Sequence, residues 1–150
     1  MNLVRDLPPI KPNLPQVTDP ADLTVLTAPD CPAAIWSRQH SEALSVWLDR
    51  LPASQLPRWR ETVVVEEVSD AVRDACAEAG TPEGAERDDL ITGLQMLADT
   101  FAVLMKISAL LLRLDVITSN ACKRFHIDAV SARLICTFRG TGTQLVAAES

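Results

Sequence analysis

The stretch that decides the fold is ERDDLITGLQMLADTFAVLMKISALLLRLDV, residues 86–116. Its first two thirds repeat apolar residues every three or four positions, which predicts an amphipathic helix from about Glu86 to Lys106, with Gln95 on the polar side. The apolar stripe of this helix consists of Leu90, Leu94, Leu97, Phe101, Leu104 and Met105. The period then changes to two between Leu110 and Val116, which is typical of a strand.

Several elements are expected before this stretch. Ser41 is placed to cap a helix that ends at Pro52, and a short strand, residues 33–36, precedes it. The β-branched run 62–65 predicts a buried strand. A further helix begins at Ser69, or a turn earlier at Glu66, and ends at Gly80, where glycine favours a helix C-terminus.

After the long helix we expect three strands, namely the alternating run to Val116, Lys123–Asp128 and Ala132–Phe138, followed by a loop over residues 139–143. Helices followed by strands predict an α+β fold. Residues 1–32 are rich in proline and read as an extended leader, with an arm docked on the domain as the alternative. Residues 33–150 then form a single α+β domain.

The composition excludes several classes of function. Hydrophobic residues make up 47% and charged residues 23% of the chain, which is ordinary for a soluble globular domain. A net charge of −6 argues against nucleic acid and anionic membranes, because both are bound through clustered Lys and Arg. The four cysteines form no C-x-x-C pair and no secretory signal is evident, so we expect a reduced, cytoplasmic protein.

The motif with the most chemistry is His126-Ile127-Asp128. On a strand, residues two apart face the same side, so this imidazole and carboxylate would project together. They are two thirds of the 2-His-1-carboxylate set that holds non-haem iron. The other histidine of the chain, His40, supplies a third ligand only if the N-terminal region folds over the strands. The alternative interpretation is a solvated strand face or a hydrogen-bonded His-Asp pair.

Other residues offer different ligands. Cys122, four residues before His126, is a further metal candidate, and with Cys136 it would form a site suited to Zn(II). Cys136 is expected to face the core instead. Arg124 shares the expected face of His126, and Arg139 carries a planar guanidinium that can bind a carboxylate or phosphate. Both arginines are therefore candidates for binding a cosubstrate.

The last third of the chain resembles a bacterial family, the domain-of-unknown-function family 1826. The resemblance rests on Arg113-Leu114, on the Cys122–Asp128 segment with its Cys-x-x-Phe-His-x-Asp pattern, and on Leu134–Thr143, which reads Leu-Ile-Cys-Thr-Phe-Arg-Gly-Thr-Gly-Thr. It extends more loosely upstream to about residue 30.

The resemblance implies a layout similar to iron and 2-oxoglutarate dioxygenases, with a partial double-stranded β-helix, or jelly-roll, sheet beneath the N-terminal helices. Members of the family continue beyond the Gly-Thr segment to a second histidine, and this chain has no match to it, so we expect little or no turnover. Unpaired strand edges in an incomplete jelly roll favour a homodimer.

Three functions follow. The first is an Fe(II) domain that resembles 2-oxoglutarate oxygenases, with His126 and Asp128 as metal ligands. The second is a non-catalytic Zn(II) protein of metal homeostasis that also uses Cys122. The third is an inactive interaction domain. The substrate is not indicated by any pattern in the sequence.

Overall fold

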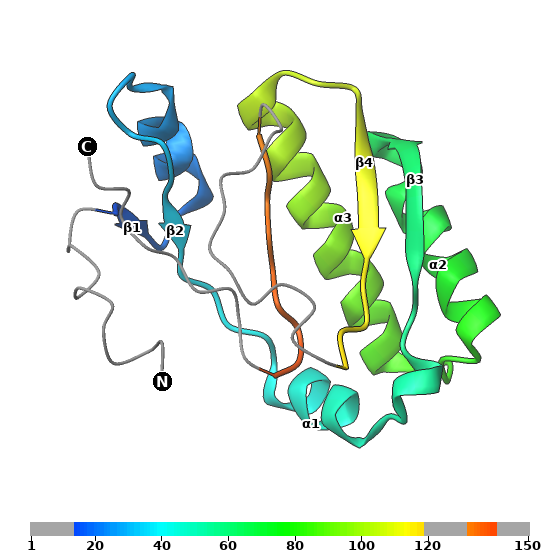
Figure 1. The fold of residues 1–150 in the computed structure, drawn as a ribbon. Helices are drawn as coiled ribbons and strands as arrows, with labels where there is room; N and C mark the ends of the chain where they lie inside the picture. Colours follow the sequence, from blue (N-terminus) through cyan, green and yellow to red (C-terminus); the bar gives the residue numbers. More distant parts are fainter. Residues whose placement is uncertain (1–13, 119–131, 141–150) are drawn as a thin grey trace, which may run out of the picture.

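The computed structural model describes residues 14–118 and 132–140. Helices and strands are mixed, as an α+β fold requires. The centre is a β-α-α-β unit: β3 (Trp59–Val64), α2 (Val68–Ala79), α3 (Ala85–Met105) and β4 (Ala109–Leu114). Figure 1 shows the two helices on one side of the two-stranded sheet.

The long helix and the strand after it were both predicted from the change of period, and both are confirmed. β3 and β4 are antiparallel, with Trp59 opposite Leu114 and Val64 opposite Ala109. Because side chains alternate along a strand, one face presents Trp59, Val63, Leu110, Leu112 and Leu114 to the helices. The opposite face carries Arg60, Thr62, Val64, Leu111 and Arg113.

The main core lies between this sheet and the two helices. Val68, Val72 and Cys76 of α2 are almost completely buried and pack with Val63, Ile91 and Ala98. α2 begins at Val68 after a 3-10 turn (Val65–Glu67), so its start lies close to the expected Ser69. It ends at Gly80, whose φ of 71° is the left-handed conformation that glycine adopts without steric cost.

Gln95 departs from the expected polar face of α3. Its side-chain oxygen accepts hydrogen bonds from the backbone N–H of Ser69 (2.8 Å) and from the Ser69 hydroxyl (3.0 Å). Its Nε2 donates to the carbonyl of Val65 (2.8 Å) and to Asp99 Oδ1 (2.8 Å). The residue therefore joins α3 to the start of α2, where helix N–H groups lack partners within their own helix.

A second core cluster joins α1 (Glu42–Arg50) to α3 through Leu44, Leu48 and Leu90. The predicted cap is confirmed, because the Ser41 hydroxyl accepts a hydrogen bond from the N–H of Leu44 (3.1 Å). A short 3-10 turn, Ala53–Gln55, then leads to β3.

The N-terminal part of the described chain is structured. β1 (Gln16–Val17) pairs in parallel with β2 (Ile35–Trp36), and a 3-10 helix (Pro20–Thr27) connects them and contacts α3. Residues 14–32 of the expected leader therefore include short regular elements, one of which contacts α3. Among the described residues, no helix is long and apolar enough to cross a membrane.

Residues 132–138, predicted as a strand, are not assigned to one and pair with no neighbour in the part of the chain that is described. The predicted strand 123–128 lies outside the described residues. The described sheets are two-stranded, β1–β2 and β3–β4, and do not amount to a jelly roll.

Candidate functional site

Two extended segments far apart in the sequence, residues 35–40 and 132–139, come together beside α1 and α3 (Figure 1). In the first, Trp36, Arg38 and His40 are partly buried while the residues between them are exposed. In the second, Leu134, Cys136 and Phe138 alternate in the same way. Each segment therefore turns one face inward, and the two faces meet.

His40 stacks on Phe138. The ring centroids are 4.5 Å apart and the ring planes differ by 18°. Phe138 in turn packs against the buried cluster of Leu44, Leu48 and Leu90, which anchors the stack to α1 and α3. The segment that carries His40 therefore folds onto the segment that follows the His-x-Asp motif.

Arg38 contacts the neighbouring Cys136. Its Nη1 lies 3.8 Å from Cys136 Sγ, and its guanidinium lies 5.4 Å from the centre of the Trp36 ring, within the range of a cation–π contact. Burial raises the pKa of the Cys136 thiol, an effect that the positive charge of Arg38 opposes without cancelling it. At neutral pH this sulfur is therefore a protonated thiol, and a metal would have to displace its proton to bind it.

Arg139 holds the C-terminal segment in place. Its Nη1 donates to the carbonyl of Leu48 (3.1 Å) and to that of Leu51 (2.8 Å), at the C-terminal end of α1. The last carbonyls of a helix lack partners within it and favour a positive charge. This gives Arg139 a structural role, and its predicted contact with a cosubstrate stays a prediction.

The other predicted site residues lie outside the described residues, namely His126, Asp128, Cys122 and Arg124. Within residues 14–118 and 132–140, no three His, Cys, Asp or Glu side chains are grouped to hold a metal ion. Cys76 is fully buried in the core, and Cys31 Sγ donates to the carbonyl of Ala33 (3.5 Å).

Sequence reasoning missed Arg38 as part of this junction. The signal was present, since Trp36, Arg38 and His40 are two residues apart and an extended chain brings them to one face. The partner segment was not identifiable, because its contact spans almost a hundred residues of chain.

The chain was compared with known proteins. The family model described as "Protein of unknown function (DUF1826)" matches residues 17–150. No curated protein and no solved structure matches the chain significantly.

Proposed function

The chain belongs to the DUF1826 family of proteins of unknown function, and from this premise we propose that it is a metal-binding protein in which His126, Asp128 and His40 hold the ion. The observation that carries the proposal is the stack of His40 on Phe138. It brings the second histidine of the chain against the segment that follows the His-x-Asp motif, which supports His40 as the third ligand.

The stack leaves His40 able to bind a metal. Stacking uses the flat faces of a ring, whereas an imidazole nitrogen coordinates through a lone pair in the ring plane. Among the described residues, no hydrogen bond or ion pair occupies either His40 nitrogen. The chain from Asp128 to Ala132 is four residues long and spans up to about 14 Å when extended, so the motif is tethered close to this segment.

The donor set favours Fe(II) over Zn(II). Of the described cysteines, Cys76 lies in the apolar core and burial raises the pKa of both Cys76 and Cys136. A set of two imidazoles and one carboxylate, without thiolate, is typical of non-haem iron and leaves positions open for a cosubstrate such as 2-oxoglutarate. Bound iron would supply activation of an oxidant, and the residues of this chain would hold it in place.

The alternatives differ in ligand and assembly. A Zn(II) protein of metal homeostasis would use Cys122, because thiolate ligands favour zinc.

We also propose that the strands of this chain form part of a jelly-roll sheet that a second copy of the chain completes. Each of β3 and β4 has one paired neighbour among the described residues, and a second copy of the chain pairing at the outer edge of either strand would make the homodimer.

The test is metal content followed by anaerobic titration of the purified protein with Fe(II) and Zn(II). His40→Ala, His126→Ala and Asp128→Ala are each expected to weaken Fe(II) binding by more than about a hundredfold, since changes in the outer shell alone cost about 10–100-fold. Gln39→Ala, at the exposed neighbouring position, is the matched control and should bind as the wild type does.

The outcomes separate the three functions. Stoichiometric metal that survives His40→Ala would remove His40 from the ligand set. Preference for Zn(II) with loss of affinity in Cys122→Ser would favour the metal-homeostasis alternative. Metal at background level in the wild type would contradict the proposal and leave an interaction domain.

A further inference from the structure

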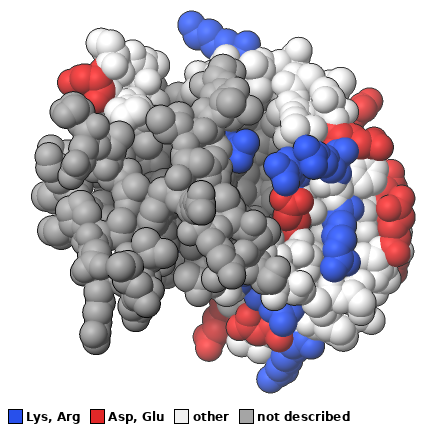
Figure 2. All heavy atoms as spheres, in the orientation of Figure 1, with Lys and Arg blue, Asp and Glu red and all other residues white. Residues whose placement is uncertain are grey.

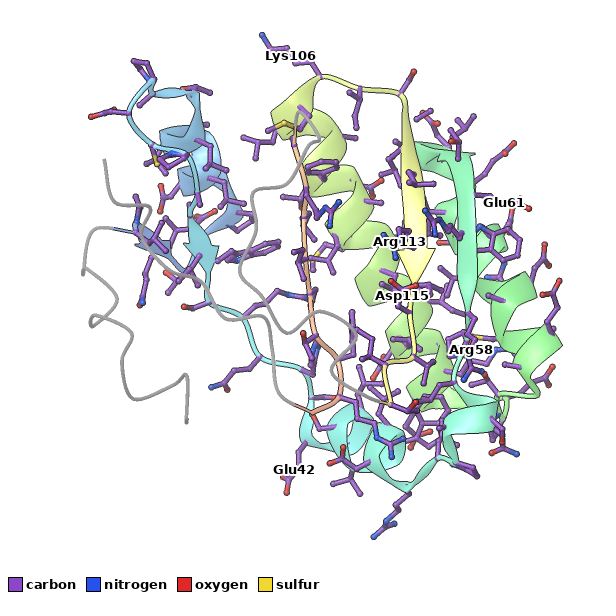
Figure 3. All side chains as sticks on the ribbon, in the orientation of Figure 1. Glu42, Arg58, Glu61, Lys106, Arg113 and Asp115 are labelled. Atoms are coloured by element: carbon purple, nitrogen blue, oxygen red, sulfur yellow. The ribbon has the colours of Figure 1, made fainter. Side chains whose placement is uncertain are left out.

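The end of the β3–β4 sheet, where β3 begins and β4 ends, holds an open cavity of about 660 Å³. Three arginines line it, namely Arg58, Arg60 and Arg113, together with Asp115 and Trp59. Figure 3 shows Arg113, Asp115 and Arg58 following one another along the front of the sheet. In Figure 2 the same face carries a group of basic side chains with an acidic patch among them.

The strand register places two of these positive charges together. Arg60 is directly opposite Arg113, on the sheet face turned away from the helices. Side chains opposite each other on antiparallel strands lie about 5 Å apart at Cβ, and like charges there are destabilising. Arg58, two residues before Arg60, adds a third charge on the same side. Folding therefore concentrates positive charge at one spot of a chain whose net charge is −6.

These charges are only partly compensated. Arg113 Nη2 forms an ion pair with Asp115 Oδ2 at 2.8 Å. Within the described parts of the chain, Arg58 and Arg60 make no ion pair. The described residues of the lining, three arginines and one aspartate among them, carry a formal charge of +2.

The cavity is also rich in hydrogen-bond donors and poor in acceptors. Each guanidinium has five N–H donors and no acceptor. Trp59 also borders the cavity, but its side chain packs against the core on the helix side of the sheet, so the donors that a ligand can reach are the guanidinium N–H groups of the three arginines. This end of the sheet therefore suits a ligand that carries negative charge and several acceptor oxygens.

We propose that this cavity binds a small oxyanion with two or more negative charges, a phosphate or a dicarboxylate, between Arg58, Arg60 and Arg113. Guanidinium groups bind both classes through paired, charge-assisted hydrogen bonds. A long polyanion is disfavoured, because the net charge of −6 repels whatever extends beyond the cavity. The site shares no residue with the proposed metal site.

The test is calorimetric titration of the full chain with inorganic phosphate and, separately, with malonate, against sodium chloride at equal ionic strength. Arg58→Gln/Arg60→Gln is expected to weaken binding by about tenfold to a hundredfold, because charge-assisted hydrogen bonds are lost. Arg73→Gln/Lys106→Gln removes the same charge from exposed positions elsewhere and should change affinity less than about twofold. The anion that binds more tightly identifies the class.

A second variant changes affinity in the opposite direction. Asp115→Asn frees Arg113 from its ion pair and raises the local charge, so it should tighten binding several-fold, a gain that misfolding does not produce. Equal loss in both double variants, unchanged affinity in Arg58→Gln/Arg60→Gln, or weaker binding in folded Asp115→Asn would overturn the proposal. So would wild-type binding no stronger than that of chloride.

Discussion

At the scale of the residue, burial controls the chemistry of the cysteines. Cys76 is completely buried in the core between α2, α3 and the sheet. Desolvation raises the pKa of its thiol above the ordinary value of 9.0, against smaller opposing effects of Thr81 and Arg87. A thiol held protonated in this way behaves as a small apolar core residue.

This pKa shift predicts a pH dependence of stability. As pH rises above about 9, the unfolded chain loses the Cys76 proton while the folded chain keeps it, so the free energy of unfolding falls. The slope approaches about 1.4 kcal/mol per pH unit at most, which is one proton. Urea unfolding between pH 8 and 10 should show a shallower fall in Cys76→Ala, although that variant is less stable throughout.

The other titratable groups are the same in the wild type and in Cys76→Ala, so the difference between the two slopes of unfolding free energy against pH reports the Cys76 thiol. Cys136→Ala removes a second thiol whose pKa burial also raises, so it should make the fall shallower as well. Equal slopes in the wild type and Cys76→Ala would contradict the assigned protonation state.

At the scale of the element, hydrogen bonds from one side chain join the two central helices. Gln95→Ala removes the acceptor of the Ser69 N–H and the donor to the Val65 carbonyl. The Ser69 N–H then loses its partner, while the Val65 carbonyl keeps the N–H of Val68, so we expect the free energy of unfolding to fall by about 1–3 kcal/mol. Denaturant unfolding measures this fall. The control is Thr92→Ala, at an exposed position of the same helix, which should change the free energy of unfolding by less than about 0.5 kcal/mol. A loss no larger than that of Thr92→Ala would show that these bonds contribute little.

The elements differ in how far the sequence predicts them. The helices were predictable because their signals are local: the Ser41 cap, the spacing of the apolar residues in α3 and the glycine after α2. The alternating pattern of residues 132–138 is ambiguous for a physical reason. An extended segment that packs one side against α1 and α3 alternates buried and exposed residues whether or not it pairs in a sheet. Gln95 was misread because only the fold shows that the start of α2 lies beside it.

At the scale of the whole molecule, the chain closes on itself through the junction of residues 35–40 with residues 132–139. The stack of His40 on Phe138 and the contact of Arg38 with Cys136 join the N-terminal arm to the C-terminal segment. Arg139 then ties that segment to the end of α1. The His126-Ile127-Asp128 motif of the candidate metal site could be predicted from the sequence, but the three-dimensional arrangement of the site could not. Its proposed third ligand, His40, depends on contacts that sequence spacing does not encode.

If the junction holds the molecule together, His40 and Phe138 must be energetically coupled. A stacked pair of rings contributes about 0.5–1.5 kcal/mol beyond the area that it buries. In metal-free protein, a double-mutant cycle of His40→Ala and Phe138→Ala should therefore give a coupling energy of that size in urea unfolding. The matched cycle pairs His40→Ala with Ile135→Ala, a 55% exposed neighbour on the same segment, and should give less than about 0.3 kcal/mol. Equal coupling in the two cycles would mean that the segments are linked only through the general stability of the domain. The larger coupling at Phe138 would make this ring the residue that positions His40, independently of any ion.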